Sequence, residues 1–238
     1  MSAVQSWYRS NSFDHRDFPA GWLAAERSDS ISVCVPARET AETIGPIVQT
    51  LVSLRERGVL DQVVVVDAGS VDGTAALAAS LGAEVHQDVD LLPETGPVLG
   101  KGDAIWRALS VLTGDLVCFL DSDTADFGEH FACGLLGPLV ARPELSYVKA
   151  FYRRPFRVGE VVLADGGGRV NELVARPLLS MFYPELAGVR QPLAGEMAGR
   201  RERLERLPFA CGYAVETGLL IDVYREAGLA AIAQVDLD

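Results

Sequence analysis

Positive charge, cysteine and long apolar stretches are all scarce in this sequence. The chain carries 33 aspartates and glutamates against 21 lysines and arginines, for a formal net charge of −12. Such an acidic balance argues against a protein that binds nucleic acid or a membrane surface. No apolar run approaches the ~20 residues of a membrane-spanning helix, and residues 1–18 lack the apolar segment of a signal peptide. We therefore expect a cytoplasmic protein.

None of the four cysteines belongs to a C-x-x-C pair, and Cys34 and Cys118 lie inside apolar, strand-like runs. We predict reduced, buried thiols. Hydrophobic residues make up 49% of the 238 residues and charged residues 23%, a composition that supports one large α/β domain with a sizeable core.

Strand-like and helix-like segments alternate along the first half of the chain. This order predicts a parallel sheet with right-handed crossovers, whose ligands bind beyond the carboxyl ends of the strands. We expect Pro36 to stop the first strand. The second half is less regular. The predicted strands are 31–37, 62–68, 83–88, 115–121, 145–156 and 229–238, and the predicted helices lie within 39–58, 70–82, 102–114, 164–183, 192–208 and 213–228.

Two carboxylates, Asp121 and Asp123, directly follow the apolar strand at 115–121. Side chains alternate along an extended chain, so the two can share a side where the strand ends. Such a pair suits a hard divalent cation that bridges to a diphosphate. The alternative is a solvated turn in which the aspartates cap backbone N–H groups.

Two glycine-containing turns are candidates for binding phosphate. Asp67 ends a buried strand, and a turn through Gly69, Ser70 and Gly73 leads into a helix whose first N–H groups favour anions. Lys101 stands between two glycines before another helix, where its ammonium could contact a phosphate or simply be exposed. The first turn lacks the G-x-G-x-x-G spacing, which argues against a dinucleotide-dependent dehydrogenase, and the turn at Lys101 lacks the spacing of a P-loop.

A cluster of basic residues indicates either a site for a small acidic substrate or an exposed loop that pairs with surface acids. A glycine run follows it and gives the backbone freedom to approach a ligand. The residues concerned are Lys149, Arg153, Arg154 and Arg157, then Gly166 to Gly168 and Arg169.

Glu216 lies in an apolar helical segment, where a lone carboxylate is costly unless it is exposed or has a function. His130 is interpreted as a structural or surface residue rather than a ligand.

Taken together, these motifs resemble the family of glucosyl- and mannosyl-3-phosphoglycerate synthases, retaining glycosyltransferases of the GT-A fold. The likeness covers roughly residues 20 to 238, and its later motifs are the specific ones. The stretches that carry it are "VVVVDAGSVDGT", "GKGDAIWRAL", "LDSDT", "VKAFYRRPF", "GGGRVNELVARPLL", "PLAGE" and "LPFACGYAVETGLLID".

The resemblance implies an α/β protein with a Rossmann-like, mostly parallel central sheet flanked by helices. It divides the chain into a nucleotide-sugar-binding half (30–125) and an acceptor-binding half of the same domain (126–238). Residues 1–29 are polar with scattered aromatics, and we predict that they form an N-terminal surface extension. It also implies transfer of a hexose to the 2-hydroxyl of 3-phosphoglycerate with Mg²⁺ or Mn²⁺. UDP-glucose and GDP-mannose both stay open as donors, as does the route to retention. We expect a homodimer.

The resemblance assigns roles to individual residues. Lys101, Asp123 and Glu216 are the catalytic candidates, and Asp123 is the metal ligand. Asn171 stands where related mycobacterial enzymes carry a threonine. The nucleotide-sugar site would comprise Pro36, Ala37, Glu39, Ser70, Lys101, Asp121 and Ser122, and the acceptor site Gly168, Arg169 and Asn171.

The family pattern continues beyond the last residue with a histidine that binds the metal. None of His15, His86 and His130 takes that place, so we expect a further C-terminal segment. Two alternative functions are a nucleotidyltransferase that makes sugar nucleotides and a nucleotide-sugar-binding relative without catalysis. The first lacks support because no glycine-rich loop follows the first strand, which ends "VPARE".

Overall fold

The computed structural model describes residues 2–153, 156–158, 161–163 and 167–238. Arg154 and Gly166, which the sequence analysis placed in the basic cluster and the glycine run, lie outside these residues. Arg157 is described only as part of a short strand.

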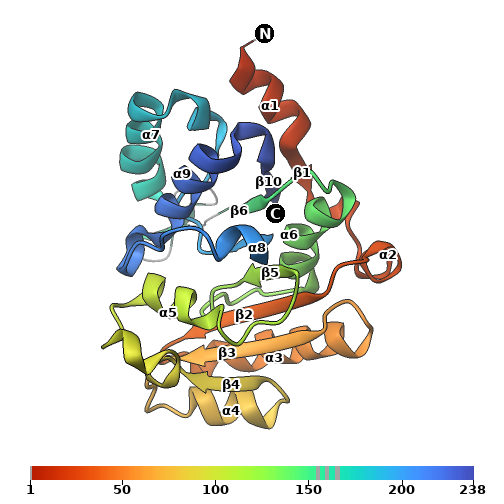
Figure 1. The fold of residues 1–238 in the computed structure, drawn as a ribbon, viewed down its shortest axis with the longest axis vertical. Helices are drawn as coiled ribbons and strands as arrows, with labels where there is room; N and C mark the ends of the chain where they lie inside the picture. The colour runs from red at the N-terminus through yellow and green to blue at the C-terminus, as the bar shows by residue number, and fades with distance from the viewer. Residues whose placement is uncertain (1, 154–155, 159–160, 164–166) are drawn as a thin grey trace.

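An eight-stranded sheet forms the centre of the molecule (Figure 1). Every neighbouring pair is parallel except the two made by β9, which is antiparallel to β5 and β6. The predicted mostly parallel α/β sheet is therefore confirmed. In spatial order the strands are β1 (Ser12–Asp14), β10 (Ile232–Asp236), β6 (Tyr147–Phe151), β9 (Met197–Arg200), β5 (Leu116–Phe119), β2 (Ile31–Ala37), β3 (Gln62–Asp67) and β4 (Glu84–Gln87). A separate hairpin pairs β7 (Phe156–Val158) with β8 (Val161–Leu163).

Helices cover both faces of this sheet. The α-helices are α1 (Ala3–Asn11), α2 (Ala20–Glu26), α3 (Ala41–Glu56), α4 (Thr74–Ser80), α5 (Lys101–Ala108), α6 (Glu129–Ala141), α7 (Arg176–Phe182), α8 (Arg201–Leu204) and α9 (Val215–Ala227). A π-helical turn (Asn171–Ala175) leads into α7, and short 3₁₀ turns lie at His15–Asp17, Asp88–Asp90, Pro93–Thr95, Pro184–Gly188, Gly212–Ala214 and Leu229–Ala231. Among the helices described, none has the length and apolarity needed to cross a lipid bilayer.

The side chains of strand β3 belong alternately to two hydrophobic cores, one on each face of the sheet. Val63 and Val65 point into the core under α3 and α6, whereas Val64 and Val66 point into the core under α5 and α9. Successive side chains of a strand face opposite sides, so a strand covered on both faces is apolar throughout. The continuous valine run is thus explained by its central position.

The predicted strand 31–37 is confirmed as β2, although it runs through Pro36 instead of stopping there. The Cys34 carbonyl accepts from Leu120 N on the β5 side at 3.1 Å, and the last β2–β5 pair is Cys34 with Phe119. Backbone groups two residues apart face the same neighbour, so the nitrogen of Pro36 points past the end of the β5 ladder. No ladder hydrogen bond is lost there, and the proline is tolerated.

Strand β9 was not predicted. The predicted loop and helix over 192–208 is wrong for 197–200, which forms a strand in the middle of the sheet. Its four residues, "MAGR", include two small ones and no β-branched side chain, so they give no strand signal.

The N-terminal segment joins the far edge of the sheet. Strand β1 pairs with β10, and Trp7 of α1 donates from its indole nitrogen to the Ile232 carbonyl at 2.8 Å. Figure 1 shows α1 beside β10, so the first and last parts of the chain lie together. The expected division into three segments stays a prediction, although residues 12–14 contribute a strand of their own.

Candidate active site

Polar side chains gather where β2, β3 and β5 end, because the carboxyl ends of parallel strands meet at one edge. Lys101 is the centre of this arrangement. Its Nζ lies 2.7 Å from Asp121 Oδ1 and 3.0 Å from Glu216 Oε1. These residues come from the start of α5, the end of β5 and the first turn of α9. We call Lys101, Asp121 and Glu216 the Lys101 cluster.

The Lys101 cluster is largely withdrawn from solvent. The side chain of Lys101 is 22% exposed, and Glu216 as a residue is 4% exposed. Burial works against the charged amine, but Asp121 and Glu216 outweigh it and raise the pKa of Lys101 above its ordinary value. The ammonium is therefore permanently charged near neutral pH, and Glu216 is buried because it is paired.

Two glycines allow Lys101 to take this place. Gly100 has a φ of +91°, a conformation that residues with a side chain rarely adopt. At Gly102, a Cβ would come within 1.9 Å of the Ala210 carbonyl oxygen. The "GKG" sequence therefore lets the start of α5 press against the segment that leads into α9.

A second group of predicted residues is joined by hydrogen bonds across the β2 and β3 ends. Ser70 Oγ accepts from Glu39 N at 2.8 Å, and Glu39 Oε1 accepts from Val71 N at 2.8 Å. Asp67, which is fully buried, accepts from Ser70 N through Oδ2 at 2.9 Å. Its other oxygen, Oδ1, is buried with no hydrogen-bond partner in the described part of the chain. A donor on a bound ligand or a water molecule could satisfy this atom, so we include Asp67 in the candidate site although the resemblance assigns it no role.

Asp121 and Asp123 have different surroundings. Asp121 is turned to Lys101, whereas Asp123 is exposed. Between them, Ser122 is buried and its carbonyl accepts from Thr43 Oγ1 at 2.7 Å, which fixes the turn. Pro36 and Ala37 end the neighbouring strand β2.

Asp123 offers one exposed carboxylate to a bound metal ion. Within the described residues, no group of three histidine, cysteine, aspartate or glutamate side chains is placed to hold a metal ion. Mg²⁺ is commonly bound by one or two carboxylates together with substrate phosphates and water, and an exposed aspartate at the sheet edge meets that need. His130 packs against the ring of His15, with centroids 4.9 Å apart.

The predicted acceptor residues lie at the start of the segment that carries α7. Gly168, with a φ of +69°, accepts from Asn171 N through its carbonyl at 2.8 Å, and Arg169 is exposed. Asn171 is 4% exposed, and its Oδ1 accepts from Leu193 N at 3.0 Å. The Asn171 side chain is thus already bound within the protein, and its direct contact with an acceptor stays a prediction.

Lys149 is not part of an exposed basic cluster, and that interpretation is wrong. It lies in β6, is fully buried, and donates from Nζ to the Ala194 carbonyl. The signal that could have revealed this is the apolar strand "YVKAF" around it, since a lysine inside such a run needs an internal partner. Arg153, beyond the end of β6, is exposed as expected.

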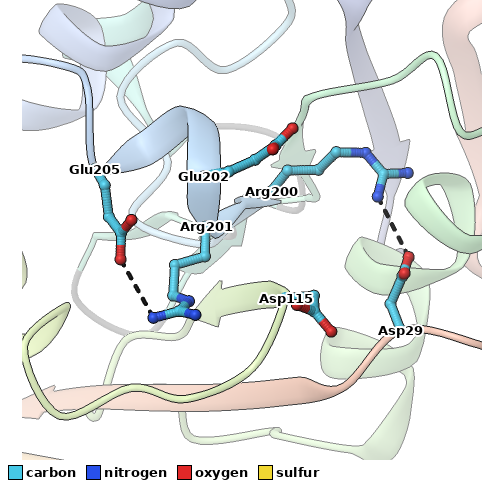
Figure 2. Close-up of a pocket in the computed structure, with 6 residues that line it drawn as sticks. All are labelled: Asp29, Asp115, Arg200, Arg201, Glu202 and Glu205. Atoms are coloured by element: carbon cyan, nitrogen blue, oxygen red, sulfur yellow. Dashed lines mark hydrogen bonds and ion pairs between the residues drawn. The ribbon is translucent and has the colours of Figure 1, made fainter.

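A hollow of about 260 Å³ lies at the opposite edge of the sheet, where β2 and β5 begin (Figure 2). Its charges are largely paired with one another, with Arg200 3.2 Å from Asp29 and Arg201 3.3 Å from Glu205. Asp115 accepts from the Ser30 hydroxyl and amide, and these bonds lower its pKa. This hollow is remote from the Lys101 cluster.

The chain is similar to a known protein family. The family model "Glycosyl transferase family 2" matches residues 32–188. Glucosyl-3-phosphoglycerate synthase of Mycolicibacterium smegmatis is 46% identical over 232 residues, which are 97% of this chain and 76% of that protein.

Solved structures give the same result. Mannosyl-3-phosphoglycerate synthase from Rubrobacter xylanophilus superposes with a TM-score of 0.91 at 49% identity, over 98% of this chain and 75% of that one. Glucosyl-3-phosphoglycerate synthase from Mycobacterium tuberculosis, in complex with Mn²⁺, UDP-glucose and phosphoglyceric acid, superposes with a TM-score of 0.86 at 44% identity, over 95% and 77%. The latter enzyme has also been crystallised with Mg²⁺ and UDP.

Proposed function

The chain belongs to glycosyl transferase family 2 and, within it, to the family of glucosyl-3-phosphoglycerate synthases, and from this membership we propose that it transfers a hexose from a nucleotide sugar to 3-phosphoglycerate. The observation that carries the proposal is the buried Lys101 cluster at the carboxyl edge of the sheet. The chain is a metal-dependent hexosyltransferase, like the relatives that hold Mn²⁺ or Mg²⁺ together with UDP.

Departure of the nucleoside diphosphate is the step that the Lys101 cluster serves. Negative charge grows on the diphosphate as the bond to the sugar breaks, and a fixed ammonium stabilises it where it develops. Asp121 and Glu216 keep Lys101 protonated and hold it in place. Asp123 would hold the divalent cation, which as a Lewis acid neutralises phosphate charge when bound. Glu39 and Ser70 fix the loops at which the nucleotide sugar would bind.

The acceptor would bind beside Gly168 and Arg169. The arginine is exposed two residues before the π-helical turn, and a guanidinium matches the oxygens of a phosphate or carboxylate. Holding 3-phosphoglycerate there would position its 2-hydroxyl for attack on the sugar.

We propose UDP-glucose as the donor, because two curated relatives that are each 46% identical carry the glucosyl name. GDP-mannose is the second candidate, on account of the mannosyl enzyme that superposes on this chain. A homodimer and a cytoplasmic location stay predictions.

To test the proposal, the purified protein is incubated with 3-phosphoglycerate and either UDP-glucose or GDP-mannose, with and without Mg²⁺. Release of UDP or GDP that requires both 3-phosphoglycerate and Mg²⁺ supports the proposal. Equal release with water as the acceptor contradicts it. Formation of pyrophosphate from glucose 1-phosphate and UTP would instead support a nucleotidyltransferase.

A further inference from the structure

Lys149 is one of only two lysines in the chain, and the mechanism above does not use it. It is fully buried, so it cannot touch a substrate from its present position. Four charged groups act on it from the surrounding elements: Glu216, Glu196, Lys101 and Asp121. A buried ammonium is costly unless it is paired and hydrogen-bonded. The burial of Lys149 next to the Lys101 cluster therefore suggests that this lysine has a function.

Its hydrogen-bond partner belongs to a segment that runs between the acceptor turn and the Lys101 cluster. We call residues 191–196 the bridging segment. On one side, Asn171 Oδ1 accepts from Leu193 N at 3.0 Å, and Gln191 Nε2 donates to the Tyr152 carbonyl. From within the sheet, Lys149 Nζ donates to the Ala194 carbonyl.

On its other side, the bridging segment lies flat against Asp121. A Cβ on Gly195 would come within 2.2 Å of Asp121 Oδ2 and 2.3 Å of Oδ1. A side chain at position 195 would therefore displace the Asp121 carboxylate. The carboxylate of Asp121 is confined between the Gly195 backbone and the Lys101 ammonium, which is 2.7 Å from Oδ1.

Resting on the proposed hexosyl transfer, we propose that Lys149 is a positioning residue: by holding the Ala194 carbonyl it keeps Gly195 against Asp121 and so aligns Lys101 for the departing diphosphate. The same segment is anchored by Asn171, so it links the acceptor turn to the leaving-group site through one short stretch of backbone. Substrate need not contact Lys149 for this effect.

Three variants test this role. Lys149→Met removes the donor while keeping much of the side-chain volume, and Gly195→Ala places a methyl group on Asp121. Gly199→Ala in β9 is the matched control, because its Cβ would come no closer than 3.2 Å to its nearest neighbours, Leu204 and the Ser146 carbonyl oxygen. Circular dichroism and thermal unfolding show which variants are folded.

Turnover is the first measurement. We expect kcat to fall at least about tenfold in Lys149→Met and Gly195→Ala, with the KM for 3-phosphoglycerate within about threefold of the parent, because alignment of Lys101 acts on the chemical step. Gly199→Ala should keep the parent kcat. Loss confined to KM, or an unchanged kcat in either folded variant, overturns the proposal.

The second measurement does not need turnover. Protein labelled with ¹³C at lysine Cε gives one signal each for Lys101 and Lys149, since the chain has no other lysine. We expect the Lys101 signal to shift in both Lys149→Met and Gly195→Ala and to stay in place in Gly199→Ala. If Lys149→Met leaves the chemical shift of the Lys101 signal unchanged, Lys149 does not position Lys101. If the parent protein does not transfer a hexose, the proposed function is wrong, but the shifts of the Lys101 signal still test whether Lys149 positions Lys101.

Discussion

Lys101 is held by carboxylates from two different elements, and each contributes to its charge and place. Glu216 is the partner that comes from furthest along the chain. Glu216→Gln keeps the shape of the side chain and removes its charge, so Lys101 loses one of the two groups that hold it.

We expect Glu216→Gln to lower kcat by roughly ten- to a hundredfold, as is typical when transition-state charge stabilisation is weakened. Steady-state kinetics check this, with Glu226→Gln at the other end of α9 as the control. Equal losses in the two variants would mean that α9 as a whole, and not the Lys101 cluster, is sensitive.

Arg169 is exposed at the acceptor turn, so its removal should affect one substrate only. We expect Arg169→Ala to raise the KM for 3-phosphoglycerate about tenfold or more, through loss of charge-assisted hydrogen bonds, and to leave the KM for the donor near the parent value. Arg176→Ala removes an arginine of the same region that pairs with Glu172, and serves as the control. A rise in the donor KM of similar size would contradict the acceptor assignment.

At the scale of elements, the start of α5 and the approach to α9 touch at Gly102. Gly102→Ala forces a methyl group onto the Ala210 carbonyl oxygen, 1.9 Å away, and should cost about 1–3 kcal/mol or more of unfolding free energy. Urea denaturation measures this. Gly21→Ala in α2, where nothing lies within 4 Å, should be neutral or slightly stabilising. Equal stability of the two variants would show that α5 moves away at no cost.

The elements that could be predicted from sequence are those buried on both faces or clearly punctuated. The valine run of β3 and the glycine-flanked start of α5 are examples, and they deliver Asp67 and Lys101 to the site. Strand β9 could not be found, because its antiparallel pairing and its place between β5 and β6 depend on partners distant in sequence. The prediction of an exposed Lys149 is wrong for the same reason. The Ala194 carbonyl that accepts its hydrogen bond lies 45 residues further along the chain.

At the scale of the whole molecule, Lys149 links stability to pH. Burial lowers its pKa from 10.5 to about 8, which corresponds to roughly 3 kcal/mol. The unfolded chain holds this proton up to about pH 10.5 while the folded chain releases it above about pH 8, so the free energy of unfolding rises with pH between these values.

We therefore compare the free energy of unfolding of Lys149→Met with that of the parent. We expect this difference to favour the variant more at pH 7 than at pH 10.5, by up to about 3 kcal/mol. Chemical denaturation of both proteins at the two pH values gives the comparison. A difference between the proteins that does not change with pH would mean that Lys149 titrates normally.

Removal of the metal should abolish activity but leave the stability of the substrate-free protein almost unchanged. Asp123 is exposed and outside the two cores, so EDTA should abolish turnover and shift the melting temperature of the substrate-free protein by less than about 2 °C. Mn²⁺ with UDP should raise it, since both would bind only the folded state. A large loss of stability with EDTA alone would place the ion within the protein core.

The order of strands in the sheet also bears on how the polypeptide is made. Strand β9 fills the gap between β5 and β6, and β10 fills the gap between β6 and β1. On the ribosome, the edges of these earlier strands wait unpaired until residues 197–200 and then 232–236 emerge, and open edges invite pairing between nascent chains. Strand β1 can therefore join the sheet only after β10 has been made, because Ser12–Asp14 pairs with Gln234–Asp236.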